Sequence, residues 1–190
     1  MNHMKKKLMI LILVVAAVLL VGYTTMRSDK TTKDIAKEWS LSTDVIESLS
    51  LLGAEQNVKS TIIETDKEET VVKLTGKVSD KTEKELNKTK AKKESLEITL
   101  SDIDGFKLMP SNDGKSELEM QIFLGKNASI KHLKIESIVG NVDITVPQDF
   151  QGKYVTTAKN GGEVLEVPDT SKDQDEVIEI NTIGDIRIKK

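Results

Sequence analysis

The sequence predicts a mainly β protein: a β-solenoid that follows one N-terminal transmembrane helix. Three observations predict it. Fourteen consecutive apolar residues follow a short basic start at the N-terminus. Apolar side chains alternate at period two through most of the remaining chain. A Gly-polar-aliphatic step recurs every 22 residues near the C-terminus. The same pattern also allows an alternative fold, an antiparallel β-sandwich whose hairpin glycines are evenly spaced.

The N-terminal residues have the features of a membrane anchor. Three lysines at 5–7 precede the apolar run Leu8–Val21, and low polarity continues to Met26. At ~1.5 Å of helical rise per residue, this stretch spans about 28 Å, close to the thickness of the bilayer hydrocarbon. A cleaved signal peptide starts in the same way, but residues 21–24 offer no small-x-small cleavage site. We therefore expect residues 1–26 to form a cytoplasmic basic start and a single-pass anchor in a cell membrane, with the C-terminal domain extracellular.

The charge balance argues against nucleic acid as a partner. The chain holds 28 Lys and Arg and 31 Asp and Glu, and three of the lysines precede the apolar run. Residues 27–190 therefore contain 25 basic and 31 acidic residues, a formal charge of −6, which does not suit a polyphosphate. The chain has no cysteine, so disulfide-stapled scaffolds and a lipid-modified N-terminal cysteine are excluded.

The remaining chain divides into a linker and a β-strand domain. Residues 27–37 are polar except for Ile35, and we expect them to be a linker to an extracellular β-strand-repeat domain at 38–190. Residues 80–94 break the alternation, and their Lys and Glu content predicts a charged connection with one or two helical turns. The clearest half-buried strands are predicted at 72–78, 96–100 and 118–124.

The most informative feature is the repeated step. It occurs at Gly140-Asn141-Val142, Gly162-Glu163-Val164 and Gly184-Asp185-Ile186. Glycine permits the positive φ of a tight turn, the polar residue faces water, and the β-branched residue starts a strand that packs inward. We therefore interpret Gly140, Gly162 and Gly184 as repeat turns between rungs that stack into a narrow aliphatic core. The C-terminal strand, residues 186–190, carries lysines that would blunt an exposed sheet edge.

Several segments resemble a known family. They are TVVKLTGKV at 70–78, SLEITLSD at 95–102, GNVDITVP at 140–147 and IGDIRIKK at 183–190. With the basic-start anchor, they resemble the putative adhesin, β-strand-repeat family of bacterial membrane-anchored proteins, and within it the LiaG-like members. The resemblance implies a right-handed, β-helix-like solenoid exposed at the bacterial surface, with no assigned activity and sometimes an association with cell-envelope-stress regulation. One departure is Glu166, which stands where the alternation predicts an apolar residue.

No catalytic set is recognisable in the sequence. It contains no GxSxG or HExxH motif and just two histidines, so we expect no enzyme activity, no cofactor and no metal site. Paired carboxylates for glycoside cleavage cannot be picked out, because 31 acidic residues offer many pairs. The one local excess of positive charge, a candidate contact for a polyanion such as a wall polymer or lipid headgroup, comprises Lys88, Lys90, Lys92 and Lys93.

The leading hypothesis is a noncatalytic, membrane-anchored cell-envelope protein. It would be an adhesin-like binding or scaffold domain that contacts an envelope protein or a cell-wall polymer and is linked to envelope stress. One alternative is a polysaccharide-active enzyme of the β-helix kind, whose acidic residues cut a glycan. The other is an accessory subunit of a membrane signalling system, bound through the exposed strand edge of the C-terminal rung.

Overall fold

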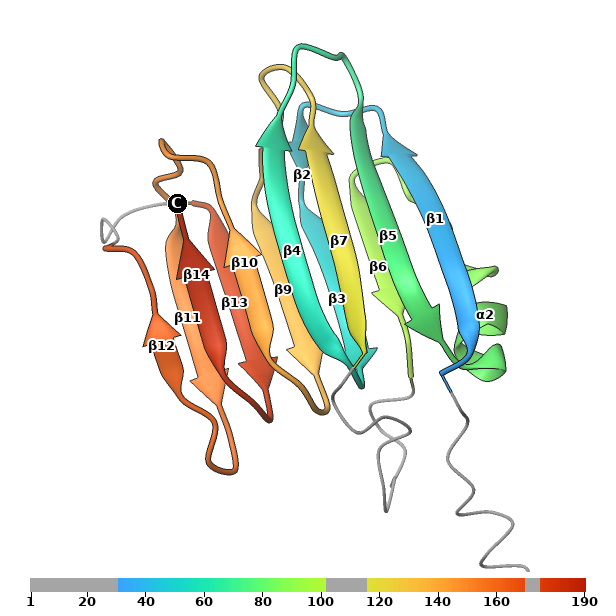
Figure 1. The fold of residues 1–190 in the computed structure, drawn as a ribbon. Coiled ribbons are helices and arrows are strands. Elements are labelled where there is room, and N and C mark those ends of the chain that lie inside the picture. The colour runs from blue at the N-terminus through green and yellow to red at the C-terminus, as the bar shows by residue number, and fades with distance from the viewer. Residues whose placement is uncertain (1–30, 102–115, 170–174) are drawn as a thin grey trace, which may run out of the picture.

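The computed structural model describes residues 31–101, 116–169 and 175–190, which form two β-sheets lying face to face with one short helix, α2 (Asp80–Leu86), at one end (Figure 1). The seven-stranded sheet contains, in spatial order, β1 (Lys33–Leu41), β5 (Thr70–Val78), β7 (Glu117–Leu124), β4 (Asn57–Glu64), β10 (Val142–Thr145), β14 (Ile186–Lys189) and β12 (Val164–Glu166). The five-stranded sheet contains β11 (Lys153–Ala158), β13 (Val177–Thr182), β9 (His132–Ser137), β3 (Ser48–Ala54) and β6 (Ser95–Thr99). A separate pair consists of β2 (Val45–Ile46) and β8 (Ser129–Ile130).

The core lies between the two sheets and is almost entirely aliphatic. Alternate residues of most strands point inward, as β7 illustrates with Leu118, Met120 and Ile122, all fully buried. Burial of these side chains is the main favourable contribution to folding, about 1.5–3 kcal/mol for each large one. The mainly β class is therefore confirmed, and the strands predicted at 72–78, 96–100 and 118–124 correspond to β5, β6 and β7.

The solenoid prediction is wrong, because the layers do not stack in chain order. In a solenoid each rung packs on the rung before it, so β12 would lie between β10 and β14. Instead β14 pairs with β10 on one side and with β12 on the other, and β13 lies between β9 and β11. The two sheets also stay open at their ends rather than closing into one coil.

The antiparallel sandwich is also wrong. In the described part of the chain, only β1 with β5 and β5 with β7 pair antiparallel, and every other strand pairing is parallel. The reason is that the chain mostly crosses between the sheets at each turn, so strands that share a sheet run in the same direction. The seven-stranded sheet is mixed and the five-stranded sheet is wholly parallel.

The three repeat glycines lie at one corner of the fold, in the spatial order Gly140, Gly184, Gly162. A Cβ on Gly184 would collide with the carbonyl oxygen of Gly140, and a Cβ on Gly162 with that of Gly184. Gly140 has φ +112° and Gly184 φ +157°, values that L side chains rarely adopt. The 22-residue spacing thus reflects a shared corner where backbones meet closely, and not sequential stacking.

The polar residue after each glycine joins neighbouring layers at this corner. Asn57 Oδ1 accepts a hydrogen bond from Asn141 N at 2.8 Å, and Asn141 Oδ1 accepts one from Asp185 N at 2.9 Å. Asp185 Oδ1 then accepts from Glu163 N at 3.0 Å. This ladder satisfies backbone N–H groups at the start of three parallel strands, β10, β14 and β12, which explains the short polar side chains of Asn57, Asn141 and Asp185.

One end of the stack is capped by α2. Ser79 begins the helix as its N-cap, with Oγ accepting from Thr82 N at 3.1 Å. Leu86 enters the core at 1% exposure, and Trp39 Nε1 donates to Thr89 O at 3.3 Å. The charged connection predicted at 80–94 does contain a short helix, and it covers β1 and β6. We call this the capped end.

The opposite end is formed by β11 and β12, which are the outermost strands of their sheets. No other described element lies beyond them (Figure 1). We use the name open end for residues 153–167, which comprise β11, β12, the residues between these strands and Val167. The C-terminal strand β14, predicted to be an exposed edge, lies inside the sheet, so the edge on which the signalling-subunit alternative depended is not there.

The prediction of a single-pass anchor is wrong for the described part of the chain. Across 31–101, 116–169 and 175–190 no helix has the length and apolar character to cross a bilayer, and α2 has seven residues. The predicted location in a bacterial cell membrane with an extracellular domain is corrected with it. Residues 1–26, where the anchor was predicted, lie outside the described residues.

Strand β1 begins at Lys33, within the stretch 27–37 for which the sequence predicts a linker. The reason is that Ile35 does not stand alone: it shares the inner face of β1 with Trp39 and Leu41, and all three are buried against the core.

Candidate functional site

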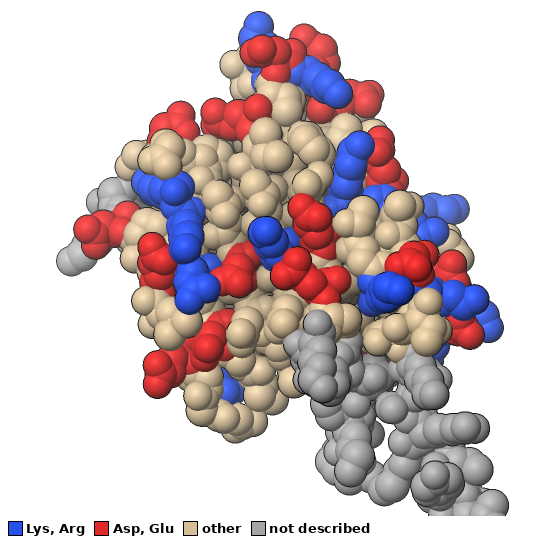
Figure 2. Space-filling view, in the orientation of Figure 1, with Lys and Arg blue, Asp and Glu red and all other residues tan. Residues whose placement is uncertain are grey.

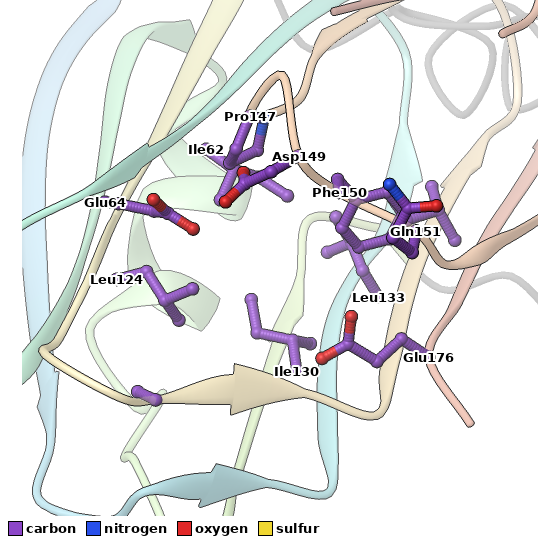
Figure 3. Close-up of a pocket in the computed structure, with 12 residues that line it drawn as sticks. Ile62, Glu64, Leu124, Ile130, Leu133, Pro147, Asp149, Phe150, Gln151 and Glu176 are labelled. Carbon is purple, nitrogen blue, oxygen red and sulfur yellow. The ribbon is translucent and has the colours of Figure 1, made fainter. Parts of the chain in front are cut away.

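A cavity of about 220 Å³ opens between the two sheets, where β4 and β7 end and β9 and β13 begin. Its apolar lining comprises Ile62, Leu124, Ala128, Ile130, Leu133, Pro147, Phe150 and Ile178. Three carboxylates, those of Glu64, Asp149 and Glu176, also line it (Figure 3). We call this cavity with its three carboxylates the acidic mouth.

Three different parts of the fold supply the carboxylates. Glu64 is the last residue of β4, Asp149 lies in the connection from β10 to β11, and Glu176 directly precedes β13. In Figure 3, Glu64 and Asp149 lie on one side of the opening and Glu176 on the other. Glu176 reaches the mouth because β13 lies next to β9; with β11 in that position, as sequential stacking requires, it would be one layer further away.

The electrostatics of the mouth are unusual for this protein. Among the described residues, none of the three carboxylates forms an ion pair or accepts a side-chain hydrogen bond. Burial raises the pKa of Glu176, and the positive charge of Lys131 lowers it in part. Lys131 itself lies 3.9 Å from Asp175 Oδ2.

The outer face of the seven-stranded sheet is different, because charges of both signs interleave on it (Figure 2). Lys73 Nζ lies 3.0 Å from Glu38 Oε2, and Arg187 Nη1 lies 3.2 Å from Asp143 Oδ1. Paired charges of this kind screen each other and leave little net attraction for a ligand. The acidic mouth is therefore a place in the described structure where carboxylates without an ion-pair partner meet apolar surface, and Lys131 offsets the charge of Glu176 only in part.

A shallower polar hollow of about 390 Å³ continues from the mouth. It lies between the turn after β4 and the turn after β7, and it shares Glu64, Leu124 and Ala128 with the mouth. The two turns are tied together, since Thr65 Oγ1 donates to Leu124 O at 2.9 Å and Lys126 N to Lys67 O at 2.7 Å. A long ligand held in the mouth can therefore extend along the protein surface.

Neither set of residues singled out from the sequence contributes to the mouth. The repeat turns Gly140, Gly162 and Gly184 lie at the strand corner described above. The lysines Lys88, Lys90, Lys92 and Lys93 follow α2 at the capped end, and all are exposed. Lys88 Nζ lies 2.8 Å from Glu85 Oε1 and Lys93 Nζ 3.9 Å from Glu94 Oε1, so part of their charge is paired.

Sequence reasoning missed all three carboxylates of the mouth. They are far apart in the chain and carry no motif, and any of the 31 acidic residues was an equal candidate. The ladder residue Asn57 had a usable signal, because Asn57-Val58 repeats the Asn141-Val142 step without the glycine. In the described part of the chain, no group of three or more His, Cys, Asp or Glu is placed to hold a metal ion.

Comparisons with known proteins give limited information. No family model and no curated protein matches the chain. It is similar to a solved structure of a putative cell adhesion protein from Clostridium sporogenes ATCC 15579, with 15% identity, 83% of this chain and 99% of that chain covered, and a TM-score of 0.33. It is also similar to a putative adhesin from Bacteroides fragilis NCTC 9343, with 12% identity, 84% and 99% covered, and a TM-score of 0.33. Both descriptions agree with the adhesin-like part of the predicted resemblance and not with its LiaG-like part, and TM-scores this low determine neither fold nor function.

Proposed function

We propose that this chain is an adhesin-like binding domain that holds its partner, an envelope protein or a cell-wall polymer, through the acidic mouth and does not transform it. One observation carries the proposal: three carboxylates that have no ion-pair partner among the described residues surround an apolar cavity. A group with a positive charge on an apolar stem, such as a lysine side chain or an alkylamine, matches both features, because its stem fills the cavity while its charge stays at the rim.

The expected affinity of a single mouth is weak. Burial of a four-carbon stem contributes on the order of 3 kcal/mol at about 0.8 kcal/mol per CH₂. Attraction to the exposed carboxylates adds roughly 0.2–1 kcal/mol each. This corresponds to a dissociation constant of roughly a millimolar. Repeated cationic groups on a protein or polymer would raise the avidity, which suits a binding domain of the adhesin kind.

Glycan cleavage is the second candidate, favoured by the contrast among the three carboxylates. Burial raises the pKa of Glu176, which favours its protonated form as a general acid, whereas the exposed Glu64 and Asp149 suit an ionised partner. The cavity of about 220 Å³ is smaller than the roughly 300–1,000 Å³ of typical enclosed ligand sites, which favours a single side chain over a sugar chain.

The test of the binding proposal uses a labelled peptide of alternating leucine and lysine, titrated into the full chain by fluorescence anisotropy. We expect acetylation of the peptide lysines, or the double variant Glu64→Gln and Asp149→Asn, to weaken binding by roughly 2- to 30-fold, because each lost attraction removes about 0.2–1 kcal/mol. The matched control replaces two exposed carboxylates elsewhere, Asp44→Asn and Glu47→Gln, and should leave binding within twofold. Equal loss in both double variants would contradict the proposal.

A second assay distinguishes the two candidates. The chain is incubated with purified cell-wall polysaccharide, and new reducing ends are measured. Binding without new ends supports the binding domain. New ends that disappear in Glu176→Gln would instead establish cleavage.

Two finer parts of the proposal rest on the resemblance and on the sequence. The LiaG-like members imply a link to envelope stress, so deletion of the gene should alter the response of an envelope-stress reporter. Lys88, Lys90, Lys92 and Lys93 remain a predicted polyanion contact, so changing all four to Gln should weaken retention on a polyphosphate resin.

A further inference from the structure

Exposed apolar side chains gather at the open end. Among the described residues, seven large hydrophobic side chains are exposed, and three of them, Val164, Leu165 and Val167, lie in or just after β12. Val155 lies on β11 and Ile183 in the turn before β14. The described residues of the capped end include no such group, and α2 packs against β1 and β6 there. Stacked β-layers need a cap at each end for solubility. Among the described residues, the open end lacks a cap like the one that α2 forms at the capped end.

Unpaired charges flank the same two strands with opposite signs. Lys153 and Lys159 lie at the two ends of β11, and Glu163 and Asp169 lie on either side of β12. All four are exposed, and none forms an ion pair within the described part of the chain. The edge of one sheet is thus acidic, and the edge of the other, beside it, is basic.

We propose that the open end binds a second copy of this chain. The strands β11 and β12 run in opposite directions (Figure 1). A two-fold axis parallel to the strands therefore sets β12 of one copy antiparallel to β11 of the second copy, and both sheets continue across the interface. This arrangement pairs Glu163 with Lys159 of the second copy and Asp169 with Lys153 of the second copy.

The charges favour the two-fold axis parallel to the strands over one perpendicular to the sheets. A two-fold axis perpendicular to the sheets would set β12 against β12 and bring acidic residues together, which is unfavourable. This arrangement also brings Val167 to within one residue of Val155 of the second copy, the offset that the bulge between Val164 and Glu166 adds, so apolar side chains cover each other. Pro168 has no N–H group and limits the new ladder to the residues before it. This inference is independent of the acidic mouth, because a different part of the fold carries it.

Disulfide crosslinking tests the contact directly, since the chain has no native cysteine. Full-length Val155→Cys and Val167→Cys chains are mixed, oxidised and separated without reductant. We expect at least fivefold more linked dimer than from a mixture of Val45→Cys and Ile63→Cys, whose side chains are 38% and 37% exposed, like the 38% and 37% of the test pair. Equal linking in the two mixtures, or linking mainly between two Val167→Cys chains, would overturn the proposal.

Charge exchange gives a second test by sedimentation velocity. One variant carries Lys153→Glu and Lys159→Glu, and the other carries Glu163→Lys and Asp169→Lys. Each alone should self-associate at least tenfold more weakly than the unaltered chain, because its two edges then have the same sign. Their mixture should associate as well as the unaltered chain does. If the mixture does not recover, or each variant self-associates normally, the second copy is not the occupant.

Discussion

Gly184→Ala perturbs the corner at which three layers meet. A Cβ at this position would collide with the carbonyl oxygen of Gly140 and lie 2.7 Å from its carbonyl carbon, and φ is +157°. Two other glycines separate these effects. Gly162 has no positive φ but would place a Cβ 2.6 Å from the carbonyl carbon of Gly184, whereas Gly161 has φ +95° and nothing within 4 Å. Gly184→Ala therefore reports steric contact plus backbone strain, Gly162→Ala reports steric contact alone, and Gly161→Ala reports backbone strain alone.

The magnitudes follow from ordinary contact distances. Carbon atoms pack at about 3.5–4.0 Å, so a Cβ on Gly162 requires the layers to separate by about 1 Å. Overpacking of this kind typically costs about 1–3 kcal/mol. Positive φ in a non-glycine residue costs roughly 1–2 kcal/mol. We expect losses of unfolding free energy of about 1–2 kcal/mol for Gly161→Ala, about 1–3 for Gly162→Ala and about 2–5 for Gly184→Ala.

Urea unfolding of the full chain measures these losses. The single tryptophan, Trp39, is buried at the capped end and reports unfolding by fluorescence without touching the mutated corner. The reasoning is refuted if Gly184→Ala is no more destabilising than Gly161→Ala, because the layers would then not be in contact at this corner.

Three further substitutions test other parts of the structure by the same unfolding assay. Ser60→Ala should stabilise the protein by about 1 kcal/mol, because Ser60 Oγ is buried and has no hydrogen-bond partner among the described residues; a loss of stability would show that it has one. Asn141→Ala should destabilise by about 0.5–1.5 kcal/mol, because Asp185 N loses its acceptor, while Gln148→Ala in the connection after β10 controls for the loss of an exposed amide. Glu176→Gln has a pH-dependent effect. The raised pKa of Glu176 means that the folded protein loses stability as pH rises above the ordinary value of 4.5, so the variant should gain stability relative to the unaltered chain as pH rises above 4.5. A gap that widens toward low pH would contradict this.

The sequence was sufficient to predict most strands but not their order. Alternation at β5, β6 and β7 reflects one buried face, which is a local property of each segment. Gly140, Gly162 and Gly184 likewise mark turns at the same corner, but three nearly identical steps do not specify which turn packs against which. The pairing of β12 with β14 also departs from the regular repeat, because it has a bulge between Val164 and Glu166, and Glu166 Oε2 lies 3.9 Å from Arg187 Nε at the edge of the sheet.

The candidate site could not be predicted for a related reason. Glu64, Asp149 and Glu176 come together only because β13 is inserted between β9 and β11. The exposed lysines after α2 formed a visible cluster in the sequence, whereas an acidic cluster built from three distant segments forms only when the strand order is set.

The strand order is the central claim, and one disulfide measurement tests it most directly. Asp143 and Arg187 are directly opposite residues of paired strands, at the interstrand spacing of about 4.8 Å that a disulfide can bridge. Asp143 and Leu165 would be neighbours if the rungs stacked in chain order, but here β14 separates them by two spacings, roughly 10 Å. Oxidation should close the bond in the Asp143→Cys and Arg187→Cys chain and not in the Asp143→Cys and Leu165→Cys chain. The opposite result would contradict the fold and the site built on it.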